Sequence, residues 1–385
     1  MNTVRLIRLS LALVLLGGVL GACDKDKDIA PPVTLVAYDA KLSVQRLWDV
    51  KLGGKDKALR LALAPAIDGG RVYAAASDGE VFAFEAKSGH SLWHTKTKLA
   101  LSAGPGAGAG IVVVGTSDGQ LLALEESSGA ARWKIRSTGE VLAMPVVAPQ
   151  AVIVRTVDGR VHALALDTGH EIWSNDEQIP RLTLRGTAAP VVAGDTVVTG
   201  YDNGKVAAYG IANGDVLWDT GVSPPRGKTE LERMVDIDGR IEVSGHDVFV
   251  AGFQGRVAML ALDSGQIWWS RELSSYRGLA LDGETLYVTT ADSSVQAMRR
   301  RDGTPLWQQD RLLRRGLTTP VVDGGSLVIA DYEGYVHWLD RASGALVGRI
   351  KSAKGRVTNA PVVADGVVYV QTDAGRLFAL RARAR

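Results

Sequence analysis

The feature that most constrains this chain is a repeat of about 40 residues. The segments SDGEVFAFEAKSGHSLW (77–93), SDGQLLALEESSGAARW (117–133) and VDGRVHALALDTGHEIW (157–173) align without gaps. Units of this length pack on their neighbours, so the repeat takes precedence over local propensity. Eight units follow from the first glycine of the pattern, which Ser293 replaces once: Gly79, Gly119, Gly159, Gly204, Gly255, Ser293, Gly334 and Gly375.

Each unit carries the signals of several β-strands. Asp-Gly and Asn-Gly between apolar runs favour two-residue hairpin turns, in which glycine adopts a positive φ at little steric cost. Stretches such as RVYAAA, IVVVGT, TVVTGY and LVIADY precede these turns and are rich in β-branched or small residues. Four strands in about 40 residues are typical of a propeller blade. The sequence therefore predicts an all-β fold, an eight-bladed β-propeller of four-stranded blades.

A second glycine and a tryptophan complete the unit. We expect the tryptophan to end the fourth strand and to wedge between neighbouring blades, because a large flat ring fills a gap between sheets. Gly348 stands at the tryptophan position of the seventh unit, which predicts a looser interface there. We interpret seven tryptophans as structural rather than ligand-stacking: Trp48, Trp93, Trp133, Trp173, Trp218, Trp269 and Trp307.

The two ends of the repeat predict how the ring closes. The eighth unit begins its pattern at Gly375, so its tryptophan would fall beyond Arg385. Near the start, QRLWDVKLG carries Trp48 without a hairpin of its own. We expect this N-terminal strand to complete the last blade, because a strand from each terminus in one blade removes an exposed edge. One propeller domain over residues 41–385 follows.

The first 22 residues predict a signal peptide. Arg5 and Arg8 precede the apolar run LSLALVLLGGVLGA, whose 14 residues fall short of the roughly 20 that a membrane helix needs. LGAC resembles a bacterial lipobox, which implies lipidation at Cys23; an ordinary signal peptide with a chance cysteine is the alternative. Residues 23–40 include DKDKDIAPPVTL and suit a tether between the lipid and the folded body.

Charge and cysteine content exclude some classes of protein. Arg5 and Arg8 are the only charged residues among the first 22, so without them the 44 basic side chains become 42, equal to the 42 acidic ones. Neutrality without a basic stripe argues against nucleic-acid binding. With a single cysteine, the chain forms no intramolecular disulfide.

Two adjacent units are longer than the others. Successive units are 40, 40, 45, 51, 38, 41 and 41 residues apart, and the extra residues lie in connections between blades. Both insertions should therefore emerge side by side on one rim. RLTLRG (181–186) lies in the first and TELERMVDIDG (229–239) in the second. Leucines flanked by charges are typical of a protein-binding patch; a short extra strand that covers the blade edge is the alternative.

The sequence offers no linear catalytic motif. His90 and His94 have a spacing that binds metal on a helix, but here they flank a predicted hairpin turn. No glycine-rich loop opens a helix, and there is no nucleophile elbow. We therefore predict no catalytic residues, no metal and no cofactor, while groups dispersed over several blades would escape such a search.

The unit ALDTGHEIW resembles the tryptophan-docking repeat of pyrroloquinoline quinone dehydrogenases, which are eight-bladed propellers. The resemblance implies the fold. Those enzymes hold the quinone over calcium and commonly carry adjacent cysteines, whereas this chain has neither a cysteine pair nor an insertion large enough for a cofactor cap. A quinoprotein-like enzyme remains the alternative function, with a general envelope adaptor or carbohydrate-binding propeller as the third.

A second resemblance is more specific. RLTLRGTAAPVV and the DID of ERMVDIDG, together with the lipobox, resemble the BamB family, the lipoprotein subunits of the bacterial outer-membrane β-barrel assembly machinery. This implies a non-catalytic periplasmic scaffold that binds the POTRA domains of BamA and assists outer-membrane protein insertion. The rest of the assembly complex and unfolded outer-membrane proteins are implied as further partners. It implicates five residues in partner binding: Leu182, Leu184, Arg185, Asp236 and Asp238.

The same resemblance leaves two questions open. The aspartates either hold Arg185 in place or pair with cations of the partner. A lipid anchor at the outer membrane is implied, yet Asp24 directly follows the cysteine, and in enterobacteria aspartate there tends to retain lipoproteins in the inner membrane.

Overall fold

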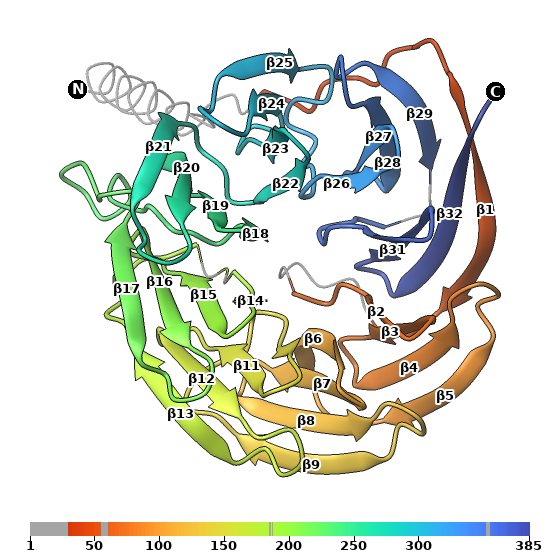
Figure 1. Cartoon of the computed structure of the whole chain (residues 1–385). Coiled ribbons are helices and arrows are strands. Elements are labelled where there is room, and N and C mark those ends of the chain that lie inside the picture. The colour runs from red at the N-terminus through yellow and green to blue at the C-terminus, as the bar shows by residue number, and fades with distance from the viewer. Residues whose placement is uncertain (1–29, 55–60, 185, 187, 352–354) are drawn as a thin grey trace, which may run out of the picture.

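The chain forms a ring of eight four-stranded antiparallel sheets (Figure 1). The computed structural model describes residues 30–54, 61–184, 186, 188–351 and 355–385. These residues form strands, turns and loops, and they contain no helix that could cross a membrane. The signal peptide, Cys23, Asp24 and Arg185 lie outside the described residues. The predicted fold class is confirmed.

Each of the first seven blades is one continuous stretch of chain, with its strands in sequence order from the centre outward. Blades 1 and 2 contain β2 (Ala66–Asp68), β3 (Arg71–Ala75), β4 (Glu80–Glu85), β5 (Ser91–Lys96), β6 (Leu101–Gly108), β7 (Ile111–Thr116), β8 (Gln120–Glu125) and β9 (Ala131–Arg136). Blades 3 and 4 contain β10 (Val146–Val147), β11 (Val152–Arg155), β12 (Arg160–Leu164), β13 (Glu171–Asp176), β14 (Val191–Ala193), β15 (Thr196–Gly200), β16 (Lys205–Gly210) and β17 (Val216–Gly221).

The remaining blades repeat this arrangement. Blades 5 and 6 contain β18 (Glu242–Ser244), β19 (Asp247–Ala251), β20 (Arg256–Ala261), β21 (Ile267–Glu272), β22 (Leu279–Asp282), β23 (Thr285–Thr289), β24 (Val295–Arg299) and β25 (Pro305–Gln309). Blades 7 and 8 contain β26 (Val321–Asp323), β27 (Ser326–Ala330), β28 (Tyr335–Asp340), β29 (Leu346–Lys351), β30 (Val362–Ala364), β31 (Val367–Thr372), β32 (Arg376–Ala384) and β1 (Leu42–Lys51).

Blade 8 closes the ring with one strand from the N-terminal part of the chain. Its strand order is β1-β32-β31-β30, and β1 pairs antiparallel with β32 from Leu42 opposite Ala384 to Lys51 opposite Arg376. The predicted closure is therefore confirmed. All eight blades of the described chain therefore have four strands, and the pairing of β1 with β32 joins the two ends of the chain within one sheet.

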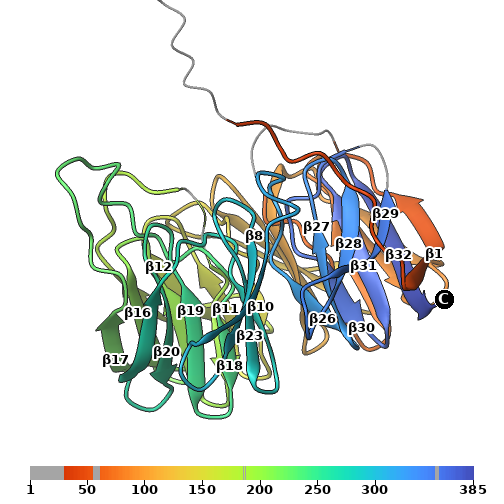
Figure 2. The ribbon, with the colours of Figure 1, turned by 90° about the horizontal axis from the view of Figure 1, so that it is seen from above.

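The ring has two faces, which differ in the turns and connections that form them. Turns between the second and third strands of a blade, together with the connections between blades, form what we call the connection face. Turns between first and second strands, and between third and fourth strands, form the opposite face. The long connections after β13 and β17 project from the connection face, as Figure 2 shows.

Tryptophan and glycine join each blade to the next. In seven interfaces the indole Nε1 donates a hydrogen bond of 2.7–3.0 Å to a backbone carbonyl of the following blade. The second glycine of that blade lies against the ring with φ between 65° and 73°, and a Cβ there would come within 2.5–2.7 Å of its nearest neighbour, an indole carbon. Only glycine satisfies both the positive φ and the close approach. We expected the tryptophan to end the outer strand, but in most blades it is the third residue of that strand, and three more residues of the strand follow it.

The interface predicted to be loose at Gly348 is filled from the neighbouring strand, so that prediction was wrong. In the other blades the residue paired with the tryptophan is small, alanine six times, or Met259. In blade 7 the pair is reversed, and Trp338 lies opposite Gly348. Trp338 is fully buried and packs with residues of blade 8 such as Phe378 and Leu380.

The reversal follows from ring closure. A tryptophan at position 348 would need a glycine at the turn between the third and fourth strands of blade 8. That turn does not exist, because the two strands come from opposite ends of the chain. A Cβ on Gly348 would instead meet Leu42 and Trp338, each at 3.3 Å.

We expect Gly348→Trp, which restores the repeat pattern, to destabilise the protein by about 1–3 kcal/mol through overpacking. Trp338→Ala should cost about 3–5 kcal/mol by leaving a cavity. Both are measured by urea unfolding of the domain comprising residues 30–385. A stabilising Gly348→Trp would contradict this account of the closure.

Candidate partner-binding site

The two insertions lie in contact on the connection face, as their spacing predicts. The first connects β13 to β14 and the second connects β17 to β18. The backbone N–H of Leu184 in the first donates a hydrogen bond to the Asp236 carboxylate in the second. This bond directly joins two segments whose bonded residues are 52 positions apart in the chain.

The described residues of RLTLRG form no strand. Leu182 is exposed, with 40% of its surface accessible, and Leu184 is half-buried. Gly186 lies against the second insertion, since a Cβ there would stand 2.5 Å from an Asp238 carboxylate oxygen. The extra strand that was the alternative reading is therefore not found in this part of the chain.

The Asp-Ile-Asp sequence (236–238) is anchored to the core by its central residue, Ile237. Ile237 is fully buried in the core between blades 4 and 5, and Gly200 allows its close approach, since a Cβ there would lie 2.4 Å from the isoleucine side chain. Residues two apart in extended chain point to the same side. Asp236 and Asp238 therefore both face away from Ile237, and both are buried.

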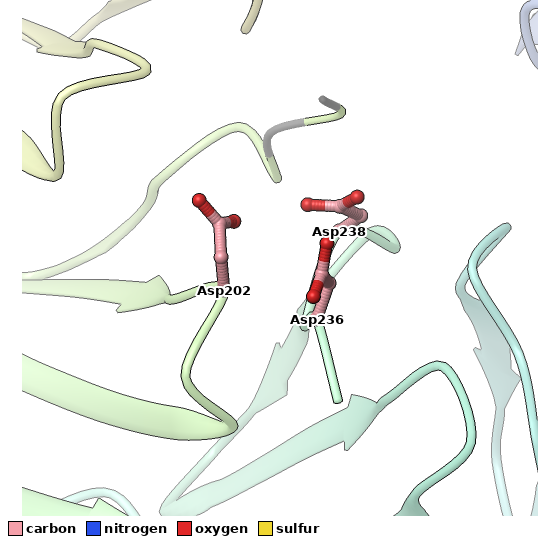
Figure 3. Close-up of side chains that lie close together, drawn as sticks. All are labelled: Asp202, Asp236 and Asp238. Atoms are coloured by element: carbon pink, nitrogen blue, oxygen red, sulfur yellow. The ribbon is translucent and has the colours of Figure 1, made fainter. Parts of the chain in front are cut away.

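A third aspartate, which the sequence reasoning missed, completes an acidic cluster. Asp202 belongs to the hairpin turn of blade 4, and its carboxylate faces those of Asp236 and Asp238 in Figure 3. One carboxylate oxygen from each of the three lies within 4.8 Å of the others. We call Asp202, Asp236 and Asp238 the acidic cluster.

Arg155 ties the acidic cluster to blade 3. Its guanidinium lies 3.1 Å from Asp202, and both side chains are fully buried. The position carries a signal that the sequence reasoning did not use: the corresponding residues of other blades are uncharged, as in Ala75 and Gly115. A buried arginine on an inner strand requires a carboxylate partner, because an unpaired buried charge is costly.

Burial shapes the electrostatics of the acidic cluster. It raises the pKa of the Asp236 carboxyl to about 6, the hydrogen bond from the Leu184 N–H acts in the opposite direction, and the Asp202 carboxylate raises the pKa further. Carboxylate oxygens are ligands of Ca²⁺ and Mg²⁺. Here, however, the guanidinium of Arg155 already supplies positive charge beside Asp202. The geometry suits the binding of a cationic side chain and the positioning of a loop.

A groove of about 520 Å³ separates the two insertions. The first insertion contributes Ile179, Pro180 and Leu182 to its lining, and the second contributes Pro225, Lys228, Glu230 and Arg233. Charged residues of both signs thus line the groove beside apolar ones. Protein interfaces combine apolar and polar contacts in this way.

Leu231 lies in a turn between Glu230 and Arg233, which line this groove, and the sequence reasoning did not single it out. The turn is a capping box: Glu232 accepts hydrogen bonds from the N–H groups of Lys228 and Thr229, and the Thr229 hydroxyl accepts one from the Glu232 N–H. These bonds fix the turn while Leu231 remains 61% exposed. An exposed leucine on a preorganised support is a candidate anchor for a partner.

Comparisons with known proteins show the family to which this chain belongs. The family profile described as "Outer membrane protein assembly factor BamB" matches residues 17–100, 77–309 and 291–384. The chain belongs to the BamB family. Its relative of that name in Marinobacter adhaerens is 48% identical over 368 residues, which cover 95% of this chain and 94% of the relative. The relative in Pseudomonas aeruginosa is 40% identical over 365 residues, 95% of this chain and 96% of the relative.

Solved structures agree with the fold. The crystal structure of BamB from Moraxella catarrhalis is similar with a TM-score of 0.81 and 27% identity, covering 88% of this chain and all of that one. Quinohemoprotein alcohol dehydrogenase from Comamonas testosteroni has a TM-score of 0.69 at 12% identity, covering 88% of this chain and 76% of that one. The latter likeness concerns the fold alone.

The raised pKa of Asp236 predicts a pH dependence of stability. Its folded value of about 6 lies above the unfolded value of about 3.9, so between these the folded state binds more protons. Stability from this group is present at low pH and is lost as the pH rises through 6. From pH 7 to pH 5, the free energy of unfolding of wild type should rise by about 1 kcal/mol relative to Asp236→Asn.

Urea unfolding at the two pH values measures this difference. Asp195→Asn, a change at an exposed carboxylate, serves as the control and should retain the wild-type pH dependence. An identical pH dependence in wild type and Asp236→Asn would contradict the assigned role of burial.

Proposed function

We propose that this protein is a non-catalytic scaffold, lipid-anchored at Cys23 on the periplasmic face of the outer membrane, that binds the POTRA domains of BamA through its two insertions. It thereby assists the insertion of outer-membrane proteins. The observation that carries the proposal is the joined pair of insertions, which present Leu182 and Leu231 on a buried ionic support. Membership of a family named for outer membrane protein assembly supplies the context.

In this proposal Leu182 and Leu231 are the apolar anchors. Both are exposed, and they come from the two insertions: Leu182 lines the groove, and Leu231 follows the lining residue Glu230 in the chain. Burying a leucine fully is worth about 1.5–3 kcal/mol. Two such anchors in a polar rim are enough to form the centre of a binding site.

Asp236 and Asp238 act within the protein rather than on the partner. Their burial and the contacts to Leu184 and Gly186 support this choice between the two roles left open by the sequence. Arg185 stands between those two residues in the chain. We propose it as the cation that the acidic cluster positions, with the guanidinium available for a carboxylate or carbonyl of the partner.

Unfolded outer-membrane proteins are proposed as further, transient partners. Each outer strand is the last strand of its sheet, so one of its edges pairs with no other strand of the described chain. The outer strands also carry exposed apolar residues such as Leu92, Ile172 and Leu306. Extended chains add to such edges through backbone hydrogen bonds. This role is secondary to the BamA contact.

Substituting the two anchors tests the proposed contact. Leu182→Asp and Leu231→Asp each place a charge in the buried centre of the interface, so each should weaken binding to the purified POTRA region of BamA roughly 10- to 100-fold. Isothermal titration calorimetry gives the affinity. The matched control is Leu217→Asp, since Leu217 is 50% exposed but lies at the start of the outer strand β17, which is the end of that strand on the opposite face.

The control variant should bind as wild type does. Unchanged affinity in both Leu182→Asp and Leu231→Asp would place the binding surface elsewhere on the ring. No binding by the wild-type protein, with folding verified by circular dichroism, would refute the proposed partner itself.

A further inference from the structure

Residues 31–41, of which 31–40 belong to the predicted tether, lie against the folded body, so this part of the chain is not a free linker. We call them the strap. Lys41 is joined to blade 7 by its N–H, which donates to the Val347 carbonyl at the start of the outer strand β29. Its own carbonyl accepts from the Arg385 N–H. The strap thus begins at the opposite face, where β1 starts and β32 ends.

From there the strap crosses the thickness of the ring. Leu35 and Tyr38 pack against the core between blades 6 and 7, and Arg349 lies 4.7 Å from the Tyr38 ring centre while donating 2.8 Å to the Val36 carbonyl. Side chain and backbone both contribute to this attachment. The strap is therefore bound along its middle and not only at its end.

The far end of the strap is fixed on the connection face. The Val33 N–H donates to the Leu313 carbonyl, and Arg315, buried in ion pairs with blade 7, donates to the Val33 carbonyl. Arg314 Nε donates 2.9 Å to the Pro31 carbonyl. Leu313, Arg314 and Arg315 belong to the connection between β25 and β26. Figure 2 shows the chain rising from β1 to the side on which the long connections project.

We infer that the strap moves the exit of the N-terminal anchor from the opposite face to the connection face, so that the face bearing the two insertions is held toward the membrane. This inference rests on the proposed lipid anchor at Cys23. Seven peptide units separate Cys23 from Ala30 and span at most about 25 Å. Without the strap, the 18 units from Cys23 to Lys41 would span about 60 Å, more than the roughly 20 Å thickness of the strands.

The partner implied for the connection face is thus a lipid surface close by, with the binding groove between them. A short connection between the lipid and the ring restricts how the ring is oriented at the bilayer. A connection about three times as long as the ring is thick would allow either face to turn toward the bilayer. The strap therefore acts as a positioning element for the proposed docking site.

Energy transfer to the membrane tests this orientation. Lipidated protein is placed in liposomes with an acceptor on the lipid headgroups, and the donor is attached at Lys228→Cys on the connection face or at His246→Cys on the opposite face of the same blade region. Transfer should be stronger from position 228. Equal transfer, or stronger transfer from position 246, would overturn the inference.

The combined changes Leu35→Asp, Arg314→Ala and Arg349→Ala are designed to release the strap, because they remove the apolar contact of Leu35 and the side-chain hydrogen bonds to Pro31 and Val36. They leave the buried Arg315 unchanged. In this variant the difference between the two donors should vanish or reverse. Arg311→Ala is the matched control, because Arg311 is an exposed arginine of the same connection whose side chain donates no hydrogen bond to the described strap residues. A released variant that keeps the wild-type difference would also overturn the inference.

Amide exchange separates failure of the strap from failure of the anchor. In the unlipidated domain the Val33 and Lys41 amides should be protected, and release should speed their exchange roughly tenfold or more, since two or more hydrogen bonds are lost. Unprotected amides in the wild-type domain would refute the strap. If these amides are protected but mass spectrometry of the protein isolated from its native membrane finds no lipid on Cys23, the proposed anchor is refuted and the strap is not.

Discussion

The contact between an indole ring and a glycine of the next blade is the interaction on which the rest of the structure depends. Each ring fills the gap between two sheets, and each indole N–H satisfies a carbonyl across that gap. Glycine is required because the ring occupies the space of a Cβ. Repeated around a closed ring, this contact fixes the blades without a disulfide. The connections between blades are then free to vary in length.

Two of these connections are the long insertions, and buried charged side chains hold them in place. Arg155 and Asp202 form a buried pair between blades 3 and 4, and Asp236 reaches from the second insertion to the first. Buried charges contribute little net stability when paired and are costly when one partner is removed. Their value here is conformational: they hold two loops in one arrangement. Leu182 and Leu231 can then remain exposed without loss of order.

The sequence predicted the ring because its marks are local and repeated: hairpin glycines, small inner residues and one tryptophan per unit. It failed where the cause is not local. The exchange of Trp338 and Gly348 depends on the missing turn of blade 8, which only the closed ring reveals. Arg155 and Asp202 are 47 residues apart, so their pairing needed the packing of two blades. Residues 31–40 of the strap were predicted as part of a tether because DKDKDIAPPVTL combines alternating charges with two prolines. The arginines that bind the strap come more than 280 residues later in the chain.

The central claim is that a closed ring presents two joined insertions to BamA. Amide hydrogen exchange of the protein with and without the purified POTRA region, read by mass spectrometry over the whole chain, tests it most directly. We expect new protection in residues 178–184 and 228–238, with no change in the turns of the opposite face. Protection confined to the outer strands or to the opposite face would contradict the account.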